Sequence, residues 1–185
     1  THNALDILLE HSTPHLAGSS FDFTRFEAIA TLMVPTFARS LLFAPGFTFR
    51  IAGGFSGGAL PLQRAFSLES ASSGIGPLGV LRGLDVKEFG GTEYVACTAE
   101  HNFRSLPFLA LGLPFLYERS IELVLHTGFA RTWNRSRLPL TESKGWYTET
   151  GIGINRVFDV LRVDFTWRLS EPAGFRFTFG VAQIL

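Results

Sequence analysis

The segment 161–169 alternates apolar and polar side chains without interruption, in the order Leu-Arg-Val-Asp-Phe-Thr-Trp-Arg-Leu. Successive side chains of a β-strand point to opposite faces, so this strand has one apolar face and one charged or polar face. The alternation resumes near the end of the chain with Phe175, Phe177 and Phe179. Such strands are typical of a membrane-spanning β-barrel with a polar interior.

The composition favours one all-β domain that spans residues 1–185 and buries a substantial surface. Hydrophobic residues make up 46% of the chain and charged residues only 17%, and there are 19 Phe and 19 Gly. Aromatic residues favour strands, and glycines favour turns. The formal net charge is zero. We find no basic stripe with interleaved aromatics, so we expect no nucleic-acid partner.

Cys97 is the only cysteine, which excludes an internal disulfide framework and a multi-cysteine zinc site. The apolar run 106–117 is interrupted by Pro107 and Pro114, and it is shorter than the roughly 18 residues expected of a spanning helix. No signal-type segment precedes the first predicted strand after Thr1. We therefore expect the C-terminal part of a longer protein, or a processed product.

Eight segments have the alternation and length of strands that cross a bilayer, for which roughly 9–11 residues are needed. The predicted strands are 4–12, 21–34, 41–54, 92–105, 117–133, 146–157, 160–169 and 174–184. Helical periodicity is weak except in the connection 106–116. The predicted fold is thus a transmembrane antiparallel β-barrel with a long loop at 55–91.

Assigning alternate residues to opposite faces places most charges on one face of each predicted strand. In the fifth strand, Leu125 and Phe129 point outward while Glu122 and His126 point inward. The second strand is less regular, because Arg25 and Glu27 share a face with Ile29 and Met33. In the sixth strand, Gly151 and Gly153 are predicted to open space on the inward face.

The connections between the predicted strands indicate which ends face outward. The predicted outer loops are 13–20, 55–91, 134–145 and 170–173, and the predicted periplasmic links are 35–40, 106–116 and 157–160. Long outer loops are typical of barrels in the bacterial outer membrane, which is therefore the predicted location. The apolar link 106–116 is an exception that suits the interfacial layer. Trp133 and Trp146 flank one outer loop and suit an aromatic girdle, with carbohydrate binding as an alternative.

A soluble β-sandwich or a lipocalin-like barrel would also alternate. Two features favour the membrane barrel: the length of the strands and the nearly uncharged outward face. The inward arginines and carboxylates point the same way, because a small dry core holds such groups only when they are paired.

The motif Val80-Leu81-Arg82-Gly83-Leu84, with Glu88-Phe89-Gly90-Gly91-Thr92-Glu93-Tyr94 after it, resembles the arginine-glycine loop of the BamA-type (bacterial surface antigen) superfamily. The resemblance implies a sixteen-stranded barrel in which this loop folds back into the lumen and five strands follow it. Five predicted strands follow Arg82, and the last, with Phe175, Phe177 and Phe179, is similar to the closing strand of the family. Residues 151–158 are most similar to Bacteroidetes outer-membrane proteins with an N-terminal carboxypeptidase-regulatory-like domain.

The resemblance implies that Arg82 and Gly83 anchor the loop through a carboxylate in the lumen. The family usually places an aspartate where this chain has Gly128-Phe129-Ala130-Arg131, which contains no acid. The partner is therefore expected among the inward carboxylates Glu100, Glu122, Glu149 and Asp164. The chain also ends in Gln183-Ile184-Leu185, without the usual terminal aromatic residue.

The function that the resemblance implies is assembly or translocation of proteins or lipids at the outer membrane. The expected partners are outer-membrane lipids, a polypeptide or lipid client, and a missing N-terminal barrel half or periplasmic domain. Two alternatives stay open: a structural barrel that anchors a periplasmic domain, and a closed eight-stranded barrel. The five histidines lie in no recognisable triad or metal-ligand spacing. We therefore predict no enzyme, no cofactor and no metal site.

Overall fold

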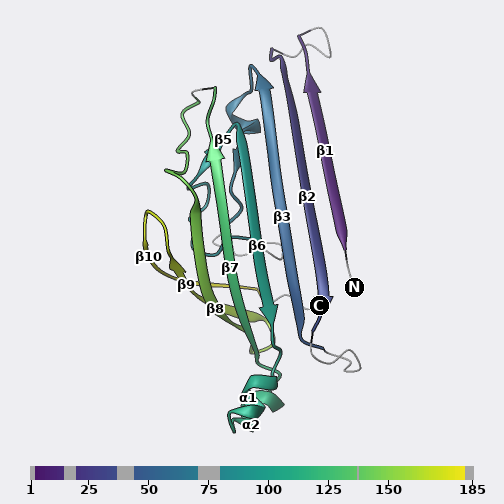
Figure 1. Cartoon of the computed structure of the whole chain (residues 1–185), viewed down its shortest axis with the longest axis vertical. Coiled ribbons are helices and arrows are strands. Elements are labelled where there is room, and N and C mark those ends of the chain that lie inside the picture. Colours follow the sequence, from purple (N-terminus) through teal and green to yellow (C-terminus); the bar gives the residue numbers. More distant parts are fainter. Residues whose placement is uncertain (1–2, 15–19, 37–43, 71–79, 137, 182–185) are drawn as a thin grey trace.

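The computed structural model describes residues 3–14, 20–36, 44–70, 80–136 and 138–181, which form mostly antiparallel β structure. One eight-stranded sheet has the order β1-β2-β3-β6-β7-β8-β9-β10 (Figure 1). Its strands are β1 (Ala4–Ser12), β2 (Phe23–Pro35), β3 (Gly46–Gly58), β6 (Glu93–Asn102), β7 (Glu122–Trp133), β8 (Tyr147–Val157), β9 (Leu161–Arg168) and β10 (Gly174–Val181). Apart from the step from β3 to β6, neighbours in the sheet are also consecutive in the chain.

Short elements lie in two of the connections. The connection between β3 and β6, residues 59–92, contains η1 (Leu62–Arg64) and the small paired strands β4 (Phe66–Ser67) and β5 (Gly90–Gly91). The connection between β6 and β7 contains the helices α1 (Leu106–Ala110) and α2 (Pro114–Glu118), which project from one end of the sheet (Figure 1). Within the described residues, no helix has the length and apolar character needed to cross a membrane.

All eight predicted strands occur, but β3, β6 and β7 differ from the prediction by three residues or more at one end. β6 ends at Asn102 rather than at 105. β3 continues to Gly58, so the predicted loop boundary at 55 is wrong. β7 begins at Glu122 rather than at 117, because residues 114–118 form α2 and proline is well suited to the first turn of a helix. The predicted starts and ends at 41–43 and 182–184 lie outside the described residues, as do much of the links 13–20 and 35–40.

The predicted separation of the two faces is confirmed. In β7, Glu122, Val124, His126, Gly128 and Ala130 are buried, and Leu125, Thr127 and Phe129 between them are exposed. We call the face that carries Glu122 and His126 the inner face, and the opposite face the outer face. Through the strand registers, the inner face also carries Arg50, Glu100, Glu149, Asp164 and Arg176.

The sheet has two unpaired edges within the described part of the chain. β1 pairs with β2 and β10 pairs with β9, and no pairing joins β1 to β10. The eight strands thus form an open sheet over these residues, and a closed eight-stranded barrel is not shown. β8 to β10 curve away behind β6 and β7 in the view of Figure 1.

Candidate functional site

The described parts of the connection 59–92, residues 59–70 and 80–92, fold onto the inner face of the sheet and form the core there. They contribute five buried side chains, Phe66, Leu68, Leu81, Leu84 and Phe89. The sheet contributes Ala52, Tyr94, Ala130 and Tyr147 to the same cluster. The connection is therefore a packed layer over the inner face, and its apolar side chains hold it there through burial.

Glycines in the sheet make room for two of these side chains. A Cβ atom on Gly54 would lie 2.7 Å from ring atoms of Phe66, and one on Gly128 would lie 2.6 Å from a methyl carbon of Leu81. The ring of Phe66 also packs against that of Tyr94, with 5.0 Å between the ring centres and a tilt of 43°. The absence of a side chain at Gly54 and Gly128 thus leaves the space that Phe66 and Leu81 of the connection occupy.

The predicted space at Gly151 and Gly153 is filled by side chains of the sheet itself. A Cβ on Gly151 would lie 2.5 Å from Nε2 of His126, and one on Gly153 would lie 2.5 Å from Oδ1 of Asp164. The two glycines therefore bring the polar side chains of β7 and β9 close together.

The Arg82 guanidinium lies between two carboxylates of the inner face. Its Nε and Nη2 donate to Oε1 of Glu100 at 3.1 and 2.8 Å, and its Nη1 donates to Oδ2 of Asp164 at 3.1 Å. The side chains of all three residues are at most 8% exposed. Charge-assisted bonds of this kind are among the strongest hydrogen bonds in proteins, and the planar guanidinium fixes their geometry.

Glu149 holds the backbone of the same motif rather than the guanidinium. Its two carboxylate oxygens accept hydrogen bonds from the backbone N–H groups of Arg82 and Gly83, at 2.6 and 2.8 Å. The Tyr147 hydroxyl donates to the same carboxylate at 2.6 Å. A Cβ on residue 83 would lie 2.5 Å from that hydroxyl oxygen and 2.9 Å from Oε2 of Glu149. Gly83 is therefore the residue that lets the loop approach the sheet this closely.

A second arginine completes the charged cluster. Arg162 on β9 donates to Oε2 of Glu100 at 2.9 Å and lies 2.9 Å from Oδ1 of Asp164. Glu100 and Asp164 are thus each shared by Arg82 and Arg162, so two positive and two negative charges balance. The sequence analysis missed Arg162, although its position two residues before Asp164 places both side chains on the same face of the strand.

Three further ion pairs have the opposite polarity, with acids in the connection and arginines on the sheet. Glu88 pairs with Arg168 at 2.5 Å, Asp85 with Arg176 at 2.5 Å, and Glu69 with Arg50 at 2.7 Å. Only the first of these pairs is mainly buried. The connection is therefore fastened to β3, β6, β8, β9 and β10 by charges as well as by its apolar core.

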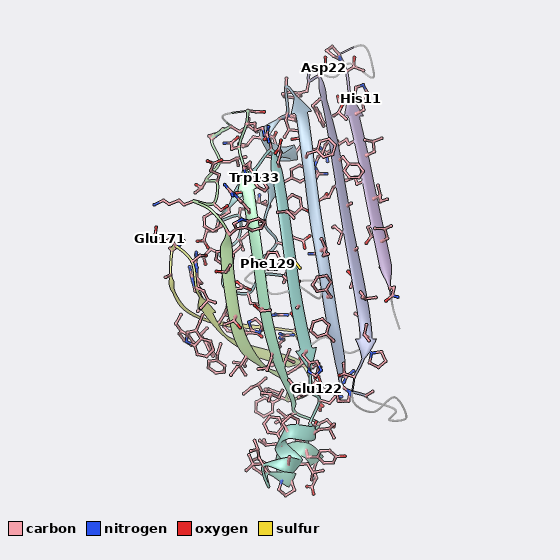
Figure 2. The ribbon with its side chains drawn as sticks, viewed as in Figure 1. His11, Asp22, Glu122, Phe129, Trp133 and Glu171 are labelled. Atoms are coloured by element: carbon pink, nitrogen blue, oxygen red, sulfur yellow. The ribbon has the colours of Figure 1, made fainter. Side chains whose placement is uncertain are left out.

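Glu122 is not a partner of Arg82, so this part of the prediction is wrong. It lies at the end of β7 that adjoins the helices (Figure 2). Its carboxylate accepts hydrogen bonds from Arg104 at 2.8 Å, from Asn102 at 2.8 Å and from Asn155 at 2.7 Å. It shares the inner face with the other candidates but is too far along the strand to reach the Arg82 motif.

The predicted aromatic residues lie on the outer side of the sheet. Trp133 is at the end of β7 opposite Glu122 (Figure 2), and Trp146 stacks edge-on against Phe129 at 5.9 Å. On β10, Phe175, Phe177 and Phe179 are all more than half exposed. Phe165 of β9 contacts Phe177 at 5.4 Å between ring centres. Their assignment to a membrane interface and to a closing strand stays a prediction.

His126 lies next to the charged cluster on the inner face. His126 lies 3.8 Å from Asp164 and 3.1 Å from the Thr166 hydroxyl, which superficially resembles a catalytic triad. Thr166, however, is fully buried. In the described residues, no group of three or more His, Cys, Asp or Glu side chains is placed to hold a metal ion. No protein-family model matches the chain, and no curated protein matches it.

Proposed function

We propose that this chain is the C-terminal half of a sixteen-stranded outer-membrane β-barrel of the BamA-type superfamily, which assembles or translocates proteins or lipids. The observation that carries the proposal is the Arg82-Gly83 motif, whose guanidinium and backbone are both held by carboxylates on the inner face. An unrelated loop arginine next to a turn glycine would be solvated instead. These contacts require an arginine at 82, whose guanidinium pairs with Glu100 and Asp164, and a glycine at 83, where a Cβ would not fit.

The outer face supports the membrane part of the proposal. In the paired registers of the eight strands, its only Asp, Glu, Lys or Arg residues are Glu93, the first residue of β6, and Arg131, near the end of β7. Arg156 lies in the irregular end of β8. The rest of this face is apolar or uncharged, with many exposed aliphatic and aromatic side chains. Lipid favours such a surface, because a charge at the bilayer midplane of a barrel costs about 2–4 kcal/mol.

The two unpaired edges support a half-barrel. In lipid, every backbone N–H and C=O group needs a partner within the protein, so an open sheet edge is not tolerated. β1 and β10 both present such edges in the described residues. Further strands from the same polypeptide would pair with both and close the wall.

In the proposed mechanism, the connection 59–92 controls the lumen, and no covalent chemistry is involved. The connection covers the inner face from β3 to β10 through the ion pairs of Glu69, Arg82, Glu88 and Asp85. Movement of this layer would open a path along the inner face for a polypeptide or lipid client. The paired arginines and carboxylates would then be exposed to water, which solvates them.

An alternative is a structural barrel that anchors a periplasmic domain, such as a carboxypeptidase-regulatory-like domain. The tight packing of the connection favours it, because Phe66, Leu68, Leu81 and Leu84 are all at most 2% exposed. A layer that is both packed and ion-paired suits a permanent plug. The two functions share one fold and differ in whether the layer moves.

Conductance across planar bilayers tests the proposal. We would compare the wild-type protein with Arg82→Ala and with Arg104→Ala, whose arginine pairs with Glu122 of β7 at 2.8 Å. A gated lumen predicts brief openings in the wild type and in Arg104→Ala, and a larger, longer-lived conductance in Arg82→Ala. A silent bilayer with all three, despite heat-modifiable migration of the inserted protein, would favour the anchor. A protein that enters neither detergent micelles nor vesicles in folded form would refute the membrane proposal.

A further inference from the structure

The helical hairpin 106–117 is apolar throughout, and most of its residues are exposed. It reads Leu-Pro-Phe-Leu-Ala-Leu-Gly-Leu-Pro-Phe-Leu-Tyr and contains no charged side chain. Neither α1 nor α2 has a buried residue. Leu111 is 71% exposed and Phe115 is 59% exposed. A soluble connection between two strands would normally be polar.

The hairpin is apolar on all sides, which indicates what surrounds it. A helix that docks in a groove of another protein has one apolar stripe and one polar face. Here the large apolar residues exposed to the surroundings are spread over both helices and the turn, namely Leu106, Leu109, Leu111, Leu113, Phe115 and Tyr117. No polar face remains for water. The hairpin therefore fits an apolar medium on every side rather than a groove.

Much of the backbone of the hairpin is satisfied internally. The N–H groups of Leu109, Leu111, Gly112, Leu113 and Leu116 donate to carbonyl groups of residues 105–113 of the same segment, at 2.8 to 3.4 Å. Internal hydrogen bonding of this kind is what a bilayer demands of any chain that enters it. The two prolines lie in the first turn of each helix, where no N–H donor is missed.

The polar residues are confined to the base of the hairpin. Arg104 precedes it and is fixed by Glu122 on the inner face. Glu118 and Arg119 follow it and are exposed. The hairpin projects from the end of β6 and β7 (Figure 1). The outer face of β7 continues this apolar surface through Leu123 and Leu125, which pair with Ile154 and Ile152.

We propose that the hairpin 106–117 inserts into the acyl-chain region of the bilayer leaflet next to its end of the sheet. This inference rests on the proposed membrane function, because the leaflet must lie beside β6 and β7. Insertion would tether these two strands, which carry Glu100 and His126, to one leaflet. The hairpin would thus fix the depth in the bilayer of β6 and β7, which hold the connection 59–92.

A fluorescent probe quenched by lipid tests the proposal. In a Cys97→Ala background, Leu111→Cys and Phe115→Cys would each be labelled with the environment-sensitive dye NBD. Phe129→Cys on the outer face and Leu62→Cys in η1 serve as matched exposed positions. The proteins would be refolded into dioleoylphosphatidylcholine vesicles, with or without phosphatidylcholine brominated on its acyl chains.

We expect the bromolipid to quench the probes at 111 and 115 at least as strongly as the probe at 129, and to leave the probe at 62 unchanged. Quenching at 129 without quenching at 111 and 115 would overturn the hairpin inference alone. Quenching at 111 and 115 without quenching at 129 would support the hairpin and refute the barrel wall. If none of the four probes is quenched, both proposals are wrong.

Discussion

The inner face of the sheet differs sharply between its covered middle and its edge at β1. Under the connection 59–92, Glu100, Glu149 and Asp164 are at most 5% exposed, and each has an arginine or backbone donor as partner. On β1, Leu8 shares the inner face through its pairing with Glu27, yet it is 48% exposed. The middle is therefore a packed interior. At the β1 edge, Arg64 of the connection pairs with Glu10 at 3.2 Å, but Leu8 is left half exposed.

The difference shows that burial on this sheet comes from the connection rather than from the strands. β1 and β9 have similar alternation, but only β9 lies under the layer that brings Arg82 to it. We therefore expect the contribution of a strand to the free energy of unfolding to increase with the extent to which the connection covers its inner face. The following predictions test that view, starting with the largest expected effect.

Arg82→Ala is expected to destabilise the covered region most. It leaves Glu100 and Asp164 with Arg162 as the remaining cation of the cluster. Breaking a buried pair by removing one partner typically costs about 3–5 kcal/mol. The loop should become sensitive to protease, and the heat-modifiable form should melt earlier. Urea unfolding in detergent micelles would measure the loss.

Arg104→Ala is the matched control for Arg82→Ala, because it removes an arginine whose carboxylate partner, Glu122, belongs to the sheet rather than to the connection. Its loop should keep the protease resistance of the wild type. Equal loop cleavage in the two variants would show that the covered region does not depend on the Arg82 contacts.

Gly83→Ala is expected to have the next largest effect. The added methyl carbon would lie 2.5 Å from the Tyr147 hydroxyl oxygen and 3.0 Å from Cγ of Arg168. Overpacking of this kind typically costs about 1–3 kcal/mol. Gly57→Ala is the control, since a Cβ there meets nothing within 4 Å. The midpoint of urea unfolding should fall for residue 83 and stay nearly constant for residue 57; similar midpoints would contradict the tight approach.

The strands and their faces were predictable from the sequence because the side-chain period of a strand is two. That period assigns Leu125 and Phe129 to one face and His126 to the other without knowledge of the fold. The end of β3 was not predictable in this way. Gly57 and Gly58 have weak strand propensity, yet both belong to β3 because they pair with Thr24 and Phe23 of β2.

The partners of Arg82 were predictable only as a set. Alternation placed Glu100, Glu122, Glu149 and Asp164 on one face, but it carries no information about their height along the sheet. That height depends on strand register and on the path of the connection, which brings Arg82 to Glu100 and Asp164 and leaves Glu122 to Arg104. The role of Glu149 as an acceptor for two backbone N–H groups has no signature in residue type.

A smaller effect is expected for the ion pair of Glu88 and Arg168. Both side chains are mostly buried, at 18% and 4% exposure. A double-mutant cycle with Glu88→Gln and Arg168→Gln should give a coupling energy of about 1 kcal/mol. The same cycle on Asp85 and Arg176, at 57% and 39% exposure, should give less because water screens an exposed pair. A larger coupling energy for Asp85 and Arg176 than for Glu88 and Arg168 would contradict the view that water is excluded from the covered region.

The smallest effect is expected at the edge, where Leu8→Ala removes an exposed side chain from β1. The change in unfolding free energy should stay within about 0.5 kcal/mol, as for most surface positions. The same substitution at Leu84, which is 1% exposed in the core of the connection, should cost about 2–5 kcal/mol. The pair thus compares one chemical change in the two regions. In a longer polypeptide that supplies the strand next to β1, the cost at Leu8 should rise while the cost at Leu84 stays the same. An unchanged cost at Leu8 would mean that the added chain does not cover this edge, which would contradict the half-barrel.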